Sequence, residues 1–286
     1  MRTASRGKHW LHARSQTPLS NQAPHFDSAK SSRMKPNLFI VGSMKCGTTA
    51  LYDFLTKHPD ISGSTPKELH YFSLHKNKSE DWYLAHFETN TKAKYLLEAS
   101  PTYFDIAWRE DIPKRIQRFN PDAKIVIMIR NPLMRAISHF YHLRTRGKVA
   151  ELQNISFTQL VRGEWPALQN HAELEEHRSC IMKFSLYEKK IENYVNVFGA
   201  DNVFLIENET MMSNGEKVVN DLLAKLSLSS LPGSLLSNKS IMVGAPKQPE
   251  DESNNRKQFE ETHSQDYERA RYITPATRIG NLNTSQ

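Results

Sequence analysis

Short apolar runs and helical spacings alternate through the middle of the chain. Four runs have the length of buried strands: Leu38–Val41, Tyr95–Glu98, Lys124–Ile129 and Val203–Ile206. The third is the most continuous, because its apolar residues follow one another from Ile125 to Ile129. These runs predict the strands of a sheet that is buried on both faces.

Helical patterns fill the intervals between these runs. Leu51, Phe54 and Leu55 have helical spacing within Thr48–His58, and Pro59 ends that segment. Strands and helices in alternation predict an α/β fold, with a central parallel sheet flanked by helices on both faces. The other helices are expected at Pro113–Phe119, Pro132–Tyr141, Leu186–Phe198 and Glu216–Leu226.

The chain divides into three zones by composition. Residues 1–36 are polar and basic and are expected to form a disordered leader. Residues 37–244 carry the apolar segments and form the predicted folded domain. Residues 245–286 are polar, and we expect a weakly packed tail with one helix near Arg256–Tyr272.

The overall charge favours anionic partners without selecting one. Lysine and arginine number 38 against 31 aspartates and glutamates, which gives a formal net charge of +7. The basic residues are scattered, which argues against a nucleic-acid-binding surface. No apolar run approaches the roughly 18 residues of a membrane span. Cys46 and Cys180 form no disulfide scaffold or metal-ligand spacing, so a reducing, cytoplasmic location without a bound metal is expected.

A glycine-bracketed loop follows the first strand. Residues Gly42–Thr49 read Gly-Ser-Met-Lys-Cys-Gly-Thr-Thr. Glycines let the backbone curl, the start of the next helix carries partial positive charge, and lysine and threonines add donors, which together suit a phosphate. A plain strand-turn-helix connection is the alternative. The candidate ligands are Lys45, Cys46, Gly47, Thr48 and Thr49.

This loop departs from that of nucleoside-triphosphate hydrolases and kinases. In those proteins a lysine directly follows the second glycine, whereas Thr48 follows Gly47 here and the lysine comes earlier, at Lys45. In addition, the strongest strand is followed by Arg130 rather than by an acidic magnesium ligand. Both departures argue against a magnesium-dependent phosphotransferase.

A second anion site is predicted after Lys124–Ile129. Arg130 follows the strand at the sheet edge where α/β folds bind ligands, and Ser138 lies two turns into the next helix. An arginine fork suits a phosphate because it donates two parallel hydrogen bonds. A solvated arginine and a surface serine are the alternative. Arg135 is left open between a cation on the helix surface and a ligand.

The segment Pro36–Leu51 resembles the 5′-phosphosulfate loop of sulfotransferases that use 3′-phosphoadenosine 5′-phosphosulfate (PAPS), most closely the heparan-sulfate-type carbohydrate branch and its bacterial relatives. The resemblance implies a P-loop-like three-layer fold and PAPS as co-substrate, with no metal. It implies that Lys45 stabilises the leaving phosphate and that the loop binds the 5′-phosphate. Arg130 and Ser138 match the family's 3′-phosphate signature.

The resemblance extends to a candidate base. Residues Thr65–Phe72 resemble the family segment Lys-Glu-x-His-Phe-Phe, in which the glutamate is the general base on the acceptor hydroxyl. That role is carried over to Glu68, since a sugar hydroxyl needs its proton removed as it attacks. His70 is the rival base, and a packed, hydrogen-bonded ring is its alternative. Lys67 either helps to place the sulfuryl group or is solvated.

Two segments depart from the family. Heparan-type enzymes carry a lysine where this chain has Ala99, which puts a heparan-like acceptor in doubt. From Asn238 onward no copy of the basic loop that closes over the nucleotide is visible. Residues that could supply the missing cation are Lys239, Lys247 and Arg256.

The sequence therefore predicts sulfuryl transfer from PAPS to a hydroxyl or amine of a carbohydrate or other small acceptor. The alternatives are a P-loop small-molecule kinase and a non-catalytic nucleotide- or nucleic-acid-binding protein. The segment Gly147–Cys180, where acceptor specificity would lie, carries no readable pattern.

Overall fold

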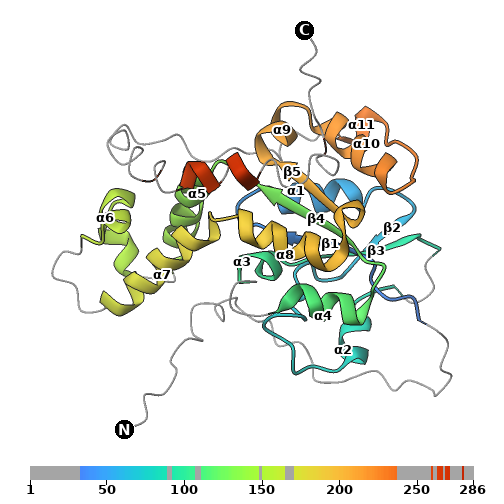
Figure 1. Ribbon diagram of the computed structural model, residues 1–286, viewed down its shortest axis with the longest axis horizontal. Helices are drawn as coiled ribbons and strands as arrows, with labels where there is room; N and C mark the ends of the chain where they lie inside the picture. Colours follow the sequence, from blue (N-terminus) through green and yellow to red (C-terminus); the bar gives the residue numbers. More distant parts are fainter. Residues whose placement is uncertain are drawn as a thin grey trace.

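A computed structural model describes residues 33–88, 92–106, 111–147, 150–164 and 171–236, together with residues 259, 263–266, 268–270 and 279 (Figure 1). The leader up to residue 32 lies outside the described residues. The predicted α/β class is confirmed, because a parallel five-stranded sheet in the order β2-β3-β1-β4-β5 runs through the molecule. Its strands are β1 (Leu38–Gly42), β2 (Ile61–Gly63), β3 (Tyr95–Ala99), β4 (Lys124–Ile129) and β5 (Val203–Glu207).

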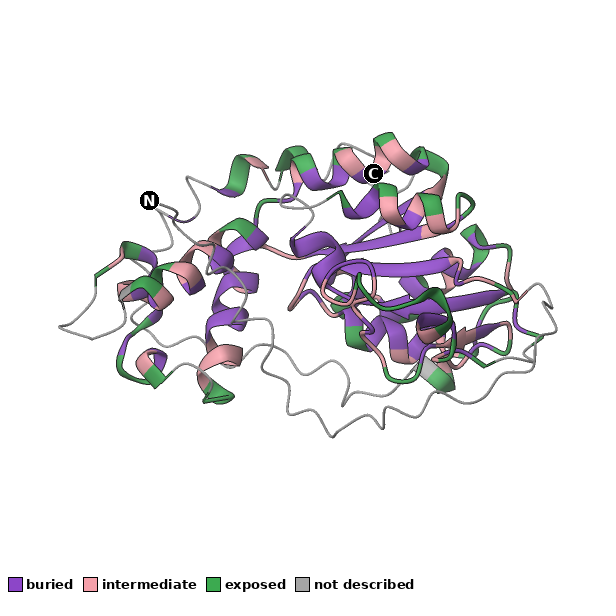
Figure 2. Ribbon diagram, turned by 90° about the horizontal axis from the view of Figure 1, so that it is seen from below, coloured by how far each residue is buried: buried purple, intermediate pink, exposed green. Residues whose placement is uncertain are grey.

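Helices cover both faces of the sheet. The helices are α1 (Thr48–Leu55), α2 (Glu80–Leu84), α3 (Thr102–Asp105), α4 (Ile112–Phe119), α5 (Pro132–Thr145), α6 (Phe157–Arg162), α7 (His171–Phe184), α8 (Glu188–Phe198), α9 (Asn208–Ser213), α10 (Gly215–Lys225) and α11 (Gly233–Leu236), with short turns of 3-10 helix at η1 (Ala150–Asn154) and η2 (Ala200–Asn202). Figure 2 shows the strands buried and the outer sides of the helices exposed.

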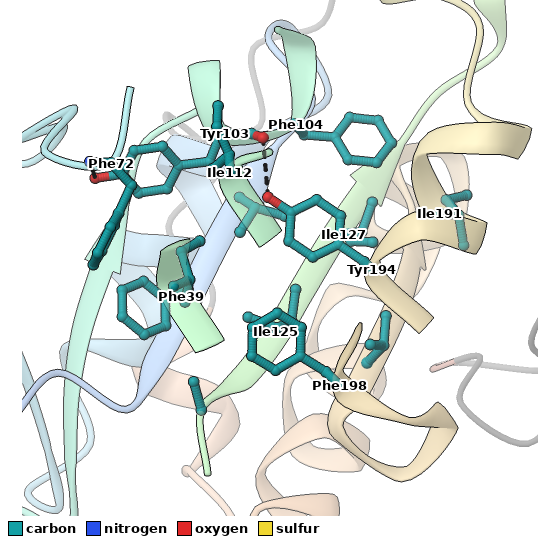
Figure 3. Close-up of a cluster of buried hydrophobic side chains, with 14 of the residues drawn as sticks. Phe39, Phe72, Tyr103, Phe104, Ile112, Ile125, Ile127, Ile191, Tyr194 and Phe198 are labelled. Carbon is teal, nitrogen blue, oxygen red and sulfur yellow. Dashed lines mark hydrogen bonds between the residues drawn. The ribbon is translucent and has the colours of Figure 1, made fainter. Parts of the chain in front are cut away.

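The alternation of side chains along β1 and β4 divides the core into two layers. Phe39 and Ile127 point to the face covered by α2, α4 and α8, and Ile40 and Val126 to the face covered by α1 and α10. Figure 3 shows part of the first layer, where the Tyr194 hydroxyl of α8 donates to the carbonyl of Tyr103 at 2.9 Å. The unbroken apolar strands therefore reflect burial on both faces.

A third apolar cluster joins α5 to the segment that carried no readable pattern. Phe140 of α5 packs with Leu152 of η1, Phe157 of α6 and Ile181 of α7. In Figure 1 these helices project beyond the end of the sheet where α5 begins. Segment 147–180 thus contributes helices, which the sequence pattern did not reveal.

Most predicted elements match the structure within one or two residues. The strand Lys124–Ile129 has the predicted bounds, and the helix predicted to end at Tyr141 continues to Thr145. The predicted helix Thr48–His58 is shorter, since α1 ends at Leu55 and a turn follows. The three-residue strand β2 was missed because it is too short to show a pattern.

Four of the described residues of the tail are buried. Phe259 and His263 lie in helical segments and are both 1% exposed, and Ala270 is fully buried. Ile279 donates its N–H to the carbonyl of Leu205 in β5 at 2.9 Å. At these four positions the tail packs against the domain, and weak packing of the tail as a whole stays a prediction. Most of the predicted helix near Arg256–Tyr272, and Lys239, Lys247 and Arg256, lie outside the described residues.

Candidate active site

The parallel strands all end at one edge of the sheet, and the candidate residues follow their ends. Lys45 follows β1, Arg130 follows β4, and Glu68 follows β2. Because β1 lies between β3 and β4 in the sheet, the Lys45 loop is central, with Arg130 on one side and Glu68 on the other. The structure therefore brings the three predicted positions to the edge where parallel sheets bind ligands.

Gly47 forms the turn that opens helix α1. Its φ of 94° lies in the left-handed region, and a Cβ there would lie 2.8 Å from Asn208 Nδ2. The first-turn N–H groups, including those of Thr48 and Thr49, have no acceptor within the helix, and no side chain caps the helix. Thr48 is buried and Thr49 is exposed. The start of α1 thus leaves its N–H groups open to a ligand, and anion binding there stays a prediction.

The rest of the loop, residues 43–46, is held by the protein itself. Ser43 N donates to the carbonyl of Met128 at 2.7 Å, and Cys46 N donates to the carbonyl of Ser43 at 3.2 Å. Asn208 Nδ2 donates to the carbonyl of Cys46 at 3.1 Å. The Cys46 thiol lies in the core, and burial raises its pKa to about 12, so it is neutral. The N–H and the thiol of Cys46 both face the protein, so among the loop groups Lys45 and the start of α1 are the better placed for the predicted ligand.

Lys45 lies among other cations. Its Nζ is 3.4 Å from His142 Nδ1, and Arg130 Nη1 donates to the Lys45 carbonyl at 3.3 Å. Burial lowers the pKa of Lys45, and the charges of Arg146 and Arg130 lower it further. An anion bound here would relieve this repulsion and favour the charged lysine.

Hydrogen bonds to the main chain hold Arg130 and Asn131 in position. The Tyr187 hydroxyl donates to the Arg130 carbonyl at 2.9 Å, and Asn131 N donates to Glu209 Oε1 at 2.9 Å. Ser138, 9% exposed, lies on the second turn of α5, which begins directly after Arg130 and Asn131. Arg130 and Ser138 thus belong to one strand-to-helix junction, beside the Lys45 loop.

Arg135 fits neither of the two alternatives left open by the sequence, a cation on the helix surface or a ligand. It is fully buried, with Nε donating to Ser185 Oγ at 2.7 Å and Nη2 to the carbonyl of Ile181. Its Nη1 lies 3.3 Å from His139 Nδ1. The guanidinium joins α5 to the end of α7, because an internal arginine needs hydrogen-bond partners. Arg135 is therefore a structural cation rather than a surface charge.

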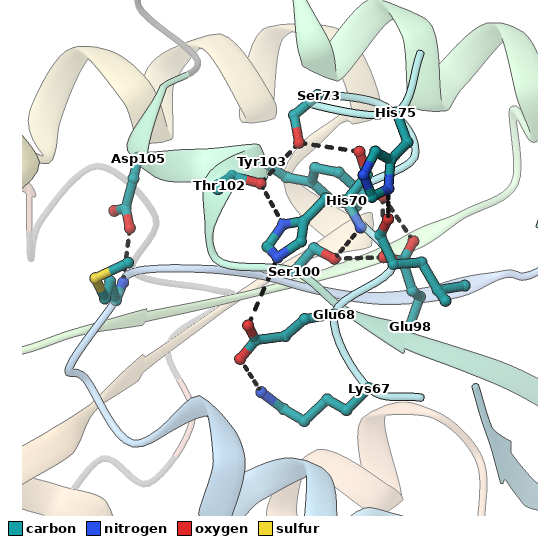
Figure 4. A network of polar contacts seen from close by, with 12 residues as sticks. Lys67, Glu68, His70, Ser73, His75, Glu98, Ser100, Thr102, Tyr103 and Asp105 are labelled. Atoms are coloured by element: carbon teal, nitrogen blue, oxygen red, sulfur yellow. Dashed lines mark hydrogen bonds and ion pairs between the residues drawn. The ribbon is translucent and has the colours of Figure 1, made fainter. Parts of the chain in front are cut away.

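Glu68 lies between two nitrogen-bearing side chains (Figure 4). Lys67 Nζ is 2.9 Å from Glu68 Oε1, and His70 Nε2 is 3.6 Å from Glu68 Oε2. The side chains of all three are between 15% and 18% exposed. The carboxylate is thus accessible and oriented, and Lys67 is held against it rather than solvated. This geometry suits a general base.

His70 is tied to the segment that follows β3. Its Nδ1 is 2.8 Å from Thr102 Oγ1, and its N–H donates to Ser100 Oγ at 2.9 Å. Ser100 Oγ in turn donates to the buried carboxylate of Glu98 at 2.5 Å. Because Nδ1 is engaged by Thr102, Nε2 is the ring nitrogen directed at Glu68 (Figure 4).

Position 99, where the family resemblance leads us to expect a lysine, is closed off by an alanine. Ala99 is fully buried at the end of β3, in the core layer beneath α1. Lys67 is the lysine that the structure places on the Glu68 carboxylate.

Several polar residues around these loops were not identified from the sequence. Asp105 accepts from Ser43 Oγ at 2.5 Å and from Met44 N at 2.9 Å, and Asn208 supports the same loop. Ser100 and Thr102 support the base loop. The only available signal was their place after β3 and β5, since their partners lie far away in the sequence.

Two absences hold for the described part of the chain. Its residues form no group of three or more histidine, cysteine, aspartate or glutamate side chains suited to a metal ion. None of its helices has the length and apolar character needed to cross a bilayer.

Comparison with curated proteins gives heparan sulfate N-deacetylase/N-sulfotransferases from several animals. The chain is 30% identical over 203 residues to the mouse (Mus musculus) bifunctional heparan sulfate N-deacetylase/N-sulfotransferase 1, which is 68% of this chain and 22% of that protein. It is 29% identical over 215 residues to the Drosophila melanogaster enzyme of the same description, covering 68% of this chain and 20% of that protein. The match thus spans about a fifth of each relative.

Structural comparison gives the same result. A crystal structure of a sulfotransferase from Alicyclobacillus acidocaldarius superposes with a TM-score of 0.66 and 27% identity, covering 83% of this chain and 94% of that one. The sulfotransferase domain profile matches residues 35–269, which is most of the chain and includes both anion loops and Glu68. The chain therefore belongs to the sulfotransferase domain family.

Proposed function

We propose that this sulfotransferase takes its sulfuryl group from PAPS and passes it to a hydroxyl or amine of a carbohydrate or other small acceptor. The observation that carries the proposal is the contact between Arg130 and the Lys45 loop. Two cationic positions, each at a strand-to-helix junction, lie side by side. A ligand with two separated phosphates matches them better than a nucleotide phosphorylated only at the 5′ position.

The residues present fit such a donor. The turn at Gly47 leaves no room for a Cβ, the start of α1 is uncapped, and Lys45 stands beside it. Arg130 and Ser138 supply a guanidinium and a hydroxyl at the neighbouring junction. The positive charge on Lys45, Arg130 and Arg146 is concentrated where a phosphosulfate and a 3′-phosphate would bring negative charge.

The proposed reaction is a single in-line transfer. Glu68 accepts the proton of the acceptor hydroxyl or amine as that atom attacks sulfur, a new bond to sulfur forms, and the bond between sulfur and the phosphate oxygen breaks. The leaving 3′-phosphoadenosine 5′-phosphate (PAP) carries the extra negative charge, which Lys45 and the start of α1 stabilise. His70 and Lys67 hold the Glu68 carboxylate. Transfer without a metal stays a prediction.

The acceptor is proposed more broadly than the relatives' names suggest. The mouse and fly relatives are named for heparan sulfate, but they share only about a fifth of their length with this chain. The buried Ala99 also differs from the lysine expected of heparan-type enzymes. We therefore propose a glycan or small-molecule acceptor in a cytoplasmic, metal-free reaction that involves no nucleic acid.

The test compares ligands and then turnover. Thermal unfolding is followed with PAP, with ATP and magnesium, and with single-stranded DNA, because a ligand of the folded state raises the melting temperature. Transfer of radioactive sulfate from labelled PAPS is then measured across a panel of glycans, phenols and amines. We expect PAP alone to stabilise the protein and at least one acceptor to be labelled. Stabilisation by ATP and magnesium but not by PAP would overturn the proposal in favour of a kinase.

A further inference from the structure

One short segment touches both halves of the site. We propose that the corner Ser100–Asp105, between β3 and the end of α3, positions the donor loop through Asp105 and the base loop through Ser100 and Thr102, so that donor binding and turnover fail separately when its two ends are changed. The inference rests on the proposed function and assigns positioning residues to it.

The Asp105 end holds the donor loop, residues 43–47. Asp105 is 1% exposed, and its two carboxylate oxygens accept from two consecutive loop residues, Ser43 Oγ at 2.5 Å and Met44 N at 2.9 Å. Met44 directly precedes Lys45, whose φ of 70° is in the left-handed region. Fixing Met44 therefore fixes the backbone from which the Lys45 side chain extends.

The charges around Asp105 explain how a buried carboxylate can lie next to the donor loop, which is proposed to bind an anion. Burial raises the pKa of the Asp105 carboxyl, while the nearby Lys190 charge and the Ser43 hydroxyl lower it. Lys190 is itself buried, 6% exposed, and donates to the carbonyls of Lys183 and Phe184 at 3.3 Å. Lys190 thus compensates the negative charge of the Asp105 carboxylate, which therefore does not have to be neutralised by Lys45.

The other end of the corner holds the base loop, residues 67–70. Thr102 Oγ1 is 2.8 Å from His70 Nδ1, and Ser100 Oγ accepts from His70 N at 2.9 Å (Figure 4). Thr102 Oγ1 is also 2.7 Å from Ser73 Oγ. These contacts set the position of the imidazole whose Nε2 faces Glu68.

The buried Glu98 anchors this end. It is fully buried and accepts from Ser100 Oγ at 2.5 Å, from Tyr83 at 2.7 Å and from Tyr103 at 2.9 Å. Ser100 is therefore fixed on one side by Glu98 and fixes His70 on the other. The two ends of the corner use different atoms and different partners, which is why their defects should separate.

The experiment uses two nearly isosteric variants in the full chain, Asp105→Asn and Thr102→Val. PAP affinity is measured by titration calorimetry, and kcat and the donor KM are measured with labelled PAPS. We expect Asp105→Asn to weaken PAP binding and raise the donor KM about tenfold, with kcat changed less than about threefold. We expect Thr102→Val to leave PAP affinity within about twofold and to lower kcat about tenfold or more. Thr102→Ser, which restores the hydroxyl, should recover most of the turnover.

Two further variants keep the test decisive. If Asp105→Asn does not fold, Ser43→Ala removes one of the same hydrogen bonds and should raise the donor KM in the same direction by a smaller factor. The double variant Asp105→Asn/Thr102→Val should show both single defects, each in its own parameter. The inference is overturned if both variants change the same parameter, or if Thr102→Ser is as slow as Thr102→Val. Failure of the wild-type protein to bind PAP would instead overturn the proposed function.

Discussion

Arg130 Nη1 donates a hydrogen bond to the main-chain carbonyl of Lys45 at 3.3 Å, across 85 positions of sequence. The contact joins the loops after β1 and β4, which are neighbouring strands in the sheet. Two patterns that the sequence presents as separate anion sites are therefore parts of one surface. The spacing of the two loops along the chain does not predict that they meet. They meet because β1 and β4 are neighbours in the strand order.

Glu68→Gln tests the base. The amide keeps the shape of the side chain but cannot take a proton, so we expect kcat to fall about a hundredfold or more while PAP affinity stays within about threefold. His70→Ala is the comparison, because His70 contacts Glu68 from one side only, and its loss should lower kcat less. Near-normal turnover of Glu68→Gln, with a larger loss for His70→Ala, would make His70 the base.

Gly47→Ala tests the shape of the anion turn. A Cβ at this left-handed position would meet Asn208 Nδ2 at 2.8 Å, so we expect a loss of about 2 kcal/mol or more in unfolding free energy and weaker PAP binding. Gly163→Ala is the matched control, since Gly163 has a φ of 69° and its nearest neighbour is Arg178 Nε at 4.0 Å. That change should cost about 1 kcal/mol and leave PAP affinity intact. Equal effects of the two variants on binding would contradict the account of the turn.

The lowered pKa of Lys45 predicts an alkaline limit to donor use. If Lys45 contacts the donor as proposed, its protonated form binds the donor more tightly than its neutral form, so kcat/KM for PAPS should begin to fall at a lower pH than for an ordinary lysine. Arg146→Gln removes the strongest neighbouring charge, raises the pKa of Lys45 and should move this limit to higher pH. Arg144→Gln is the control, because the Arg144 side chain donates to the carbonyl of Gln153. An unchanged limit in Arg146→Gln would contradict the assignment to Lys45.

The buried Lys190 predicts a pH dependence of stability. Burial lowers its pKa from 10.5 to about 8, with a partial opposing effect of Asp105. Between these values the unfolded lysine holds a proton that the folded one has released, so this side chain makes stability rise with pH. Comparing urea unfolding of the wild type and Lys190→Met, we expect the wild type to gain up to about 3 kcal/mol relative to the variant between about pH 7 and pH 10. Parallel curves would show that Lys190 does not titrate there.

The elements that the sequence predicted well are those that carry their own pattern. The apolar run of β4 and the glycine turn before Thr48 are local features, and the structure has them where they were expected. Burial of β4 on both faces explains why its apolar run is unbroken. The turn needs glycine at position 47 because its φ is positive and a Cβ there would clash with Asn208. The sheet edge that gathers Lys45, Arg130 and Glu68 then follows from parallel topology.

What the sequence could not show depends on contacts between distant residues. In the sequence Asp105 looks like any polar residue, whereas in the structure it ends α3 and its carboxylate accepts hydrogen bonds from Ser43 and Met44, 62 and 61 positions away. Arg135 shares a helix with Ser138. That its side chain points into the protein is shown only by its hydrogen bonds to Ser185 and Ile181. Such buried polar partners have no periodicity, because each is selected by one neighbour in the fold.

The most direct measurement is a calorimetric titration of PAP and of adenosine 5′-phosphate into the wild-type protein and the Arg130→Ala variant. If Arg130 holds the 3′-phosphate beside the Lys45 loop, the wild type should prefer PAP by at least about tenfold, and the variant should lose most of that preference while binding adenosine 5′-phosphate almost as before. Equal affinity of the wild type for both nucleotides, or an equal loss of affinity for both in Arg130→Ala, would contradict the claim that Arg130 holds the 3′-phosphate.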